Sequence, residues 1–80
     1  MEFKRGQVVI SAAGRDKGTR LAVAAITEHG VLVCDGKARP LERPKRKNPR
    51  HLLPTAQTLD APAMATNRSL KRALREMKIQ

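Results

Sequence analysis

Aromatic side chains are almost missing from this sequence, whose 80 residues include one phenylalanine, Phe3, and no tryptophan or tyrosine. Proteins that bind single-stranded RNA or DNA stack successive bases on several aromatic rings. A lone ring is a poor platform for a run of bases, which counts against single-strand readers of the RRM and cold-shock types. We expect Phe3 to belong to the apolar core and to close one end of the fold.

Cysteine is equally scarce and long apolar runs are missing. Cys34 is the only cysteine, so no internal disulfide can form, and we expect a reducing, cytoplasmic location in which Cys34 packs as a small apolar side chain. His29 and His51 have no metal-ligand spacing with it, so the sequence predicts neither a metal site nor a cofactor. No apolar run approaches the roughly 18 residues of a membrane-spanning helix, and we expect no membrane partner.

Acidic residues are few, with seven Asp and Glu against 17 Lys and Arg, which gives a net charge of +10. This excess favours a polyanionic partner, nucleic acid first. No carboxylate is paired with a histidine in a recognisable arrangement, and no Ser-His-Asp or Cys-His spacing of a nucleophilic enzyme is present. We therefore expect a binding protein, not an enzyme, and no small-molecule substrate.

The positive charge is concentrated in two segments. Net charges are +1 for residues 1–36, +6 for 37–51, −1 for 52–66 and +4 for 67–80. The distribution predicts a nearly neutral folded core that carries two basic attachments.

Alternating apolar residues predict a small antiparallel β structure before residue 58. In the first strand Val8 and Ile10 would lie on the buried side. The pair Asp35-Gly36 favours a type I′ hairpin turn. Short strands joined by such turns are typical of a small antiparallel barrel or a strongly curved sheet. We expect strands at about 7–11, 20–27, 31–34, 37–41 and 51–57.

Between the first two expected strands lies the basic turn Gly14-Arg15-Asp16-Lys17-Gly18. Its glycines can adopt positive φ, so we expect a tight turn with Arg15 and Lys17 at its tip and with Asp16 bonded to nearby backbone. Exposed backbone N–H groups and two cations are suited to phosphate. A merely solvated turn is the alternative.

Three prolines, at positions 40, 44 and 49, divide the basic segment 40–51. Each fixes φ and removes a backbone donor, so we expect an extended, partly polyproline loop that displays its cations outward. A solvated basic linker is the alternative. We expect replacement of Lys45, Arg46 and Lys47 with Ala to weaken binding and leave the fold intact. The candidate contacts to RNA in this segment are Arg43, Lys45, Arg46, Lys47 and Arg50.

After a linker with little charge at 58–66, the sequence predicts an amphipathic basic helix over residues 67–80. Leu70, Ala73, Leu74 and Met77 form its apolar face. The helix would pack either on the domain itself or on a partner, because about a dozen residues are marginal as an isolated helix. The opposite face carries the candidate RNA contacts Arg68, Lys71, Arg72 and Arg75, together with Lys78.

The sequence also resembles a known family. Gly6-Gln7-Val8-Val9, the turn at 14–18 and the apolar Leu21-Ala22-Val23 resemble the KOW motif of ribosomal proteins and transcription elongation factors. Asp35-Gly36 and the basic residues 43–52 are more specifically similar to the large-subunit ribosomal protein fourteen family of archaea and eukaryotes. Short bacterial KOW domain RNA-binding proteins are similar as well. The resemblance covers about residues 3–55, and residues 60–80 match nothing in it.

The resemblance implies an SH3-like barrel that binds structured ribosomal RNA through basic loops. Gly18 matches the glycine that marks the KOW motif, and Lys17 matches the basic residue before it. We therefore predict a mainly β protein: a small SH3-like barrel over 1–57 with the basic loop 40–51, a linker at 58–66 and a basic α-helix over 67–80.

The predicted function is ribosome-associated RNA binding through phosphate contacts, with large-subunit ribosomal RNA and ribosomal proteins as the expected partners in the cytoplasm. Two alternatives remain open. One is an SH3-like protein-interaction module whose basic flanks dock on an acidic transcription or translation factor. The other is an RNA or DNA chaperone unconnected with the ribosome, because a net charge of +10 does not distinguish nucleic acids.

Overall fold

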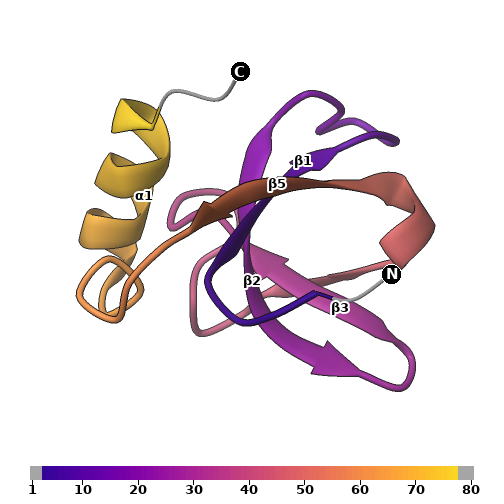
Figure 1. Cartoon of the computed structure of the whole chain (residues 1–80), viewed down its shortest axis with the longest axis horizontal. Coiled ribbons are helices and arrows are strands. Elements are labelled where there is room, and N and C mark those ends of the chain that lie inside the picture. Colours follow the sequence, from indigo (N-terminus) through magenta and orange to yellow (C-terminus); the bar gives the residue numbers. More distant parts are fainter. Residues whose placement is uncertain (1–2, 78–80) are drawn as a thin grey trace.

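The computed structural model describes residues 3–77. Within these residues, antiparallel strands form a curved sheet against which one α-helix packs (Figure 1). No described helix is long and apolar enough to cross a membrane. The elements are β1 (Gln7–Ser11), β2 (Arg20–Thr27), β3 (Gly30–Cys34), β4 (Lys45–Lys47), the 3₁₀ helix η1 (Pro49–His51), β5 (Leu52–Thr58) and α1 (Asn67–Glu76).

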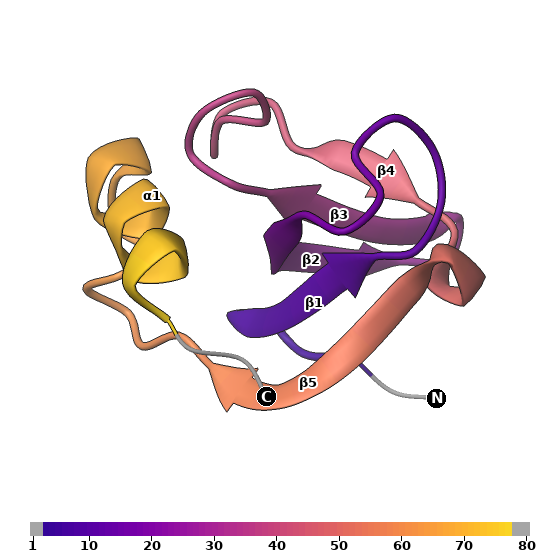
Figure 2. The ribbon, with the colours of Figure 1, turned by 90° about the horizontal axis from the view of Figure 1, so that it is seen from above.

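The strands follow the order β4-β3-β2-β1-β5, and every neighbouring pair is antiparallel. Among the described strands, β4 and β5 are the two edges and do not pair with each other, so the sheet is curved but not closed (Figure 2). The predicted mainly β antiparallel fold with a C-terminal helix is confirmed. Closure into a barrel is not observed.

Strand β1 is buried on both faces of the sheet. Val8 and Val9 are adjacent and therefore point to opposite faces, yet both are fully buried, whereas Ile10 is only partly buried. The prediction that Val8 and Ile10 form the buried side is therefore wrong for Ile10 and missed Val9. Two apolar clusters explain the pattern, one on each face. The face turned away from α1 holds Val9, Leu21, Val23, Val31, Val33 and Leu52, with Phe3 packed against them.

The second cluster joins the sheet to α1. Leu70 and Leu74 of the helix are buried against Val8 and Cys34. The helix therefore packs on the domain's own sheet, which decides between the two arrangements that the sequence left open. Residues 58–66 are more than a linker, because Met64 within them is buried in the same cluster.

The helix boundaries differ slightly from the predicted range. α1 begins after Thr66, whose Oγ1 accepts a hydrogen bond from Ser69 N at 3.1 Å in a capping box. Asn67 is the first helical residue, as the predicted range has it. The helix ends at Glu76. Residues 78–80, for which the sequence also predicts helix, lie outside the described residues.

Polar contacts hold both ends of α1 in place. Arg20 Nη1 donates to Leu74 O at 3.0 Å and to Met77 O at 2.7 Å, at the helix end where carbonyl groups lack intrahelical partners and the helix dipole favours a cation. At the first turn, Asn67 Oδ1 accepts a hydrogen bond from Leu41 N at 2.7 Å. The loop after β3 is thereby attached to the helix.

The predicted strand at 37–41 is wrong, because this loop folds back on itself. Asp35 Oδ1 accepts hydrogen bonds from Lys37 N and Arg39 N, both at 2.8 Å. Gly36 has φ +79° and approaches α1 so closely that a Cβ would lie 2.3 Å from Asn67 O. No described residue other than glycine has positive φ, so Asp35-Gly36 does not form a type I′ turn. Docking on the helix replaces the expected hairpin.

The proline segment is more ordered than the predicted extended loop. Lys45–Lys47 forms β4 at an edge of the sheet, where prolines flanking a short strand disturb no inner ladder. Pro49 then starts η1, and Asn48 caps it by accepting a hydrogen bond from Arg50 N. The last predicted strand is confirmed as β5.

We predict that Leu70→Ala lowers the free energy of unfolding by about 2–5 kcal/mol, because it leaves a cavity between α1 and the sheet. Leu53→Ala is the matched control: Leu53 is 54% exposed, and its replacement should cost less than about 1 kcal/mol. Urea denaturation followed by circular dichroism measures both. Equal losses in the two variants would mean that α1 does not pack as described.

Candidate nucleic-acid interface

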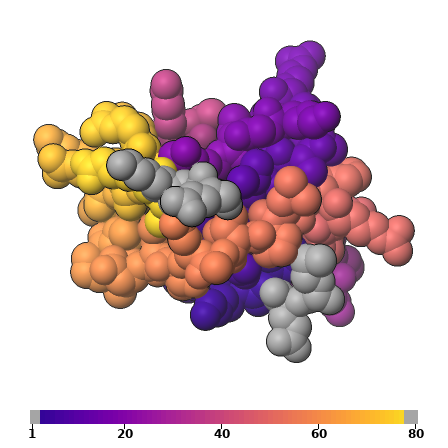
Figure 3. All heavy atoms as spheres, turned by 45° about the horizontal axis from the view of Figure 1, so that its top comes forward, coloured from indigo at the N-terminus to yellow at the C-terminus, as the bar shows by residue number. Residues whose placement is uncertain are grey.

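The turn between β1 and β2 has the tight geometry that its glycines predict. Gly14 and Gly18 have φ values of +86° and +89°, and Gly18 N donates to Ser11 O at 2.7 Å. A Cβ on Gly18 would meet nothing within 4 Å, so the glycine is required for its φ and not for space. Arg15 and Lys17 are exposed, and Figure 3 shows the turn, in purple, projecting from the surface.

Lys47 is placed differently from the other predicted contacts. Its side chain is 8% exposed, and its Nζ lies 2.8 Å from Asp16 Oδ1, 2.6 Å from Ser11 Oγ and 3.1 Å from Ala13 O. The ammonium therefore connects β4 to the turn and is not free to bind phosphate. Replacing Lys47 with Ala would break a buried ion pair and destabilise the fold. A variant meant to weaken binding and keep the fold can therefore replace Lys45 and Arg46 but not Lys47.

Asp16 is the acceptor at the centre of this contact. The hydrogen bond from Lys47 Nζ is the largest cause that lowers the pKa of the Asp16 carboxyl below its ordinary value of 3.8; burial opposes it, and the hydrogen bond from Ser11 adds to it. The main partner of the side chain thus lies across the fold, and the expected bond to nearby backbone makes only a small contribution to the lowered pKa. Its backbone carbonyl accepts the local bonds, from Thr19 N at 2.9 Å and Thr19 Oγ1 at 2.6 Å.

A second contact ties the base of the turn to η1, because Ala12 N donates to His51 O at 2.8 Å. The turn therefore lies against both β4 and η1 (Figure 2). Lys45 shares the strand face of Lys47, and Arg46 lies on the opposite face, so the cations surround this edge of the sheet. We call this set of exposed cations the loop surface: Arg15, Lys17, Lys45, Arg46 and Arg50.

The helix cations form a separate set. Their side chains are exposed opposite the packed face of α1 and line a hollow of about 240 Å³. Among the described carboxylates, Glu76 pairs with one of them, Arg72, at 3.4 Å. In both Figure 1 and Figure 2, α1 lies at the left and η1 lies toward the right. Because the two views differ by a rotation about the horizontal axis, the helix cations lie far from η1. We call this set the helix surface: Arg68, Lys71, Arg72 and Arg75.

The structure thus brings together the turn and the proline segment but separates both from the helix surface. Arg43 lies outside both sets, exposed in the loop between β3 and β4. Sequence reasoning did not anticipate a cleft beside β4, bordered by Phe3 and Asn48. The sequence predicted Phe3 at one end of the fold, but nothing in the sequence indicated that a cleft opens there.

Residues 3–77 contain no group of three or more His, Cys, Asp or Glu side chains that could hold a metal ion. Cys34 is fully buried, as predicted. Burial, with a smaller effect of the neighbouring Asp35 charge, raises the pKa of its thiol to about 11. The thiol is therefore protonated and inert at neutral pH.

A comparison with known protein families finds none that matches the chain. The resemblance to KOW proteins therefore stays a prediction based on the turn and the basic segment.

We predict that Asp16→Asn lowers the free energy of unfolding at neutral pH by about 1–3 kcal/mol, because it removes the charge that accepts the buried Lys47 ammonium. Glu28→Gln is the matched control, since Glu28 pairs with His29 at 3.5 Å in full contact with solvent and should contribute less than about 0.5 kcal/mol.

The difference between wild type and Asp16→Asn should also depend on pH. The folded-state pKa of Asp16 is lowered, so its stabilisation is complete above the ordinary value of 3.8 and is lost as the pH falls through the lower, folded value. Urea denaturation at a series of pH values should show a constant difference above about pH 5 and a shrinking one below about pH 4. A difference independent of pH would contradict the ion pair.

Proposed function

We propose that the protein binds structured RNA through phosphate contacts from the loop surface, with large-subunit ribosomal RNA as the first candidate. The proposal is supported by a net charge of +10 and by five exposed cations on adjoining elements. In this proposal the curved sheet is a KOW domain of SH3-like type, and the protein acts in the cytoplasm alongside ribosomal proteins.

The observation that carries the proposal is the contact of Lys47 with Asp16 and Ser11. It holds the projecting turn against β4, so that the turn carrying Arg15 and Lys17 lies beside the strand carrying Lys45 and Arg46. Cations on distant faces could not bind the same short stretch of nucleic acid. Here a single duplex segment can reach both.

A preformed surface also suits recognition by shape. The turn and η1 are fixed by backbone hydrogen bonds, so little backbone freedom is lost on binding. Double-stranded RNA is recognised mostly by its shape, phosphates and 2′-hydroxyl groups, which need Arg and Lys donors and no row of aromatic rings. The composition of the loop surface matches this requirement.

We predict that affinity for a short RNA hairpin falls steeply with salt, with a slope of log K against log salt of about −4 for five phosphate contacts. Filter binding at several salt concentrations measures the slope. A slope near zero would rule out phosphate binding.

Two charge-matched variants locate the surface. Arg15→Gln, Lys17→Gln and Lys45→Gln together should make the slope less steep by about 2–3, because three phosphate contacts are lost. Arg68→Gln, Lys71→Gln and Arg75→Gln remove the same charge from the helix surface and should change it by less than about 1. Melting curves check that both variants fold. The opposite result would move the site to α1.

Two further measurements distinguish the alternative functions. Equal competition by duplex RNA and duplex DNA would favour a general chaperone, because A-form and B-form duplexes differ in groove shape. Co-sedimentation with ribosomes that survives nuclease treatment would favour docking on an acidic protein.

A further inference from the structure

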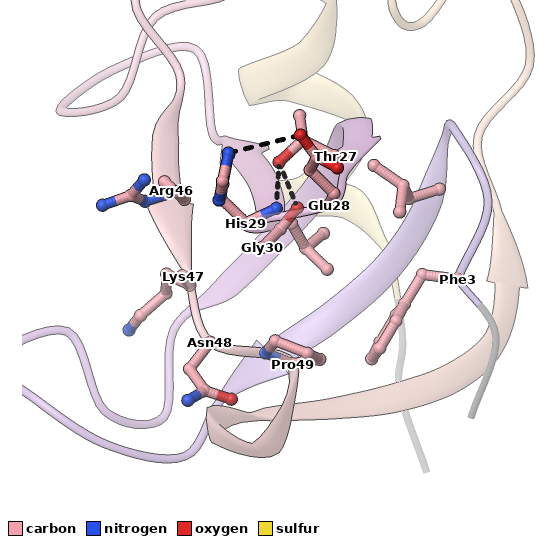
Figure 4. Close-up of a pocket in the computed structure, with 11 residues that line it drawn as sticks. Phe3, Thr27, Glu28, His29, Gly30, Arg46, Lys47, Asn48 and Pro49 are labelled. Carbon is pink, nitrogen blue, oxygen red and sulfur yellow. Dashed lines mark hydrogen bonds and ion pairs between the residues drawn. The ribbon is translucent and has the colours of Figure 1, made fainter.

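A cleft of about 1020 Å³ opens beside β4. Figure 4 shows Phe3 on one side of it and the segment Arg46–Pro49 on the other, with the β2–β3 turn at Thr27–Gly30 between them. Its size is just above the range of small-ligand sites in proteins, roughly 300–1,000 Å³.

The cleft has a mixed polar and apolar lining, in which Phe3, Ile26 and Pro49 supply apolar surfaces. Phe3 packs against the inner apolar cluster, and Ile26, which also lines the cleft, is 52% exposed. Gly30 lets β4 approach the β2–β3 turn, because a Cβ there would lie 2.8 Å from Lys47 O. The Lys47 side chain runs away from the cleft toward Asp16, so its ammonium does not enter.

Polar groups stand at the rim. Asn48 uses its amide oxygen to cap η1, so its amide nitrogen remains as a donor. His29 Nε2 lies 3.5 Å from Glu28 Oε1 in an exposed pair. Arg46 is an exposed cation that belongs to both the rim of the cleft and the loop surface. The cleft is therefore continuous with the surface that we propose for phosphate.

We infer that the cleft receives one unpaired nucleobase of the RNA held at the loop surface, with the base against Phe3 and Pro49 and its phosphate near Arg46. The inference rests on the proposed function. A base is flat and apolar on its faces and polar along its edges, which fits a cleft where the apolar surfaces of Phe3 and Pro49 lie among polar groups such as the Asn48 amide and the His29 imidazole. An apolar side chain of a protein partner would make no use of those polar groups.

This inference agrees with the scarcity of aromatic residues. One ring cannot stack a run of bases, but it can stack one base that is already extruded from a duplex. The protein would therefore prefer an RNA duplex with a bulged nucleotide close to the phosphates that it binds, and it would tolerate any base there because every base has a stacking face.

The experiment compares two RNA hairpins with the same stem, one fully paired and one with a single bulged 2-aminopurine. The wild-type protein should bind the bulged hairpin about tenfold more tightly, and the fluorescence of the 2-aminopurine should change as it stacks. Phe3→Leu, which keeps an apolar side chain against the core, should reduce the preference to about twofold with affinity for the paired hairpin unchanged. Phe3→Tyr should retain it.

Ile26→Ala is a second test that the fold should tolerate, because Ile26 is half exposed; it too should lower the preference. Arg15→Gln with Lys17→Gln should weaken binding to both hairpins equally.

Equal binding of the two hairpins by the wild type, or a preference that survives Phe3→Leu, would overturn the inference but not the proposed phosphate binding by the loop surface. Failure to bind either hairpin would overturn the proposed function itself. Displacement of the bulged hairpin by an acidic peptide with one leucine, with no loss of the paired hairpin, would assign the cleft to a protein side chain and overturn the inference.

Discussion

The contact between Lys47, Asp16 and Ser11 is the interaction on which the functional surface depends. A cation at the edge strand reaches across to the turn between β1 and β2 and is almost completely removed from solvent there. The contact has two consequences. It places the exposed cations of the turn beside those of the proline segment, and it draws the Lys47 ammonium away from the neighbouring cleft toward Asp16. A buried lysine thus organises a surface to which it does not itself contribute.

The helix gives this small domain a second core. A chain of this length buries only about 60% of its unfolded surface, so a sheet with one exposed apolar face would be marginal. α1 covers that face with Leu70 and Leu74, and Arg20 holds its C-terminal end. Because the apolar side of α1 is used in this way, its cations face outward at a distance from the turn. The positive charge is consequently divided between two surfaces of different composition.

Local features of the sequence were sufficient for several elements. The strands at 7–11 and 20–27 and the tight turn between them follow from alternation and from glycines at 14 and 18, which are short-range signals. The strand expected at 37–41 does not form. Asp35 and Gly36 favour any sharp turn, and the type of turn that they adopt depends on contact with Asn67. In the candidate site, the exposure of Arg15 and Lys17 was predictable, whereas the burial of Lys47 was not, because its partner lies 31 residues away.

By itself, the sequence determined the antiparallel β character, the positions of most strands, the basic turn and the amphipathic nature of the C-terminal segment, since each depends on spacing between near neighbours. Only the tertiary structure decided which cations remain available, which face the helix covers, and that a cleft opens beside Phe3. Those outcomes depend on contacts between residues far apart in the chain. A lysine at a strand edge looks the same in the sequence whether it reaches solvent or an aspartate, and the difference arises only when the turn is packed against it.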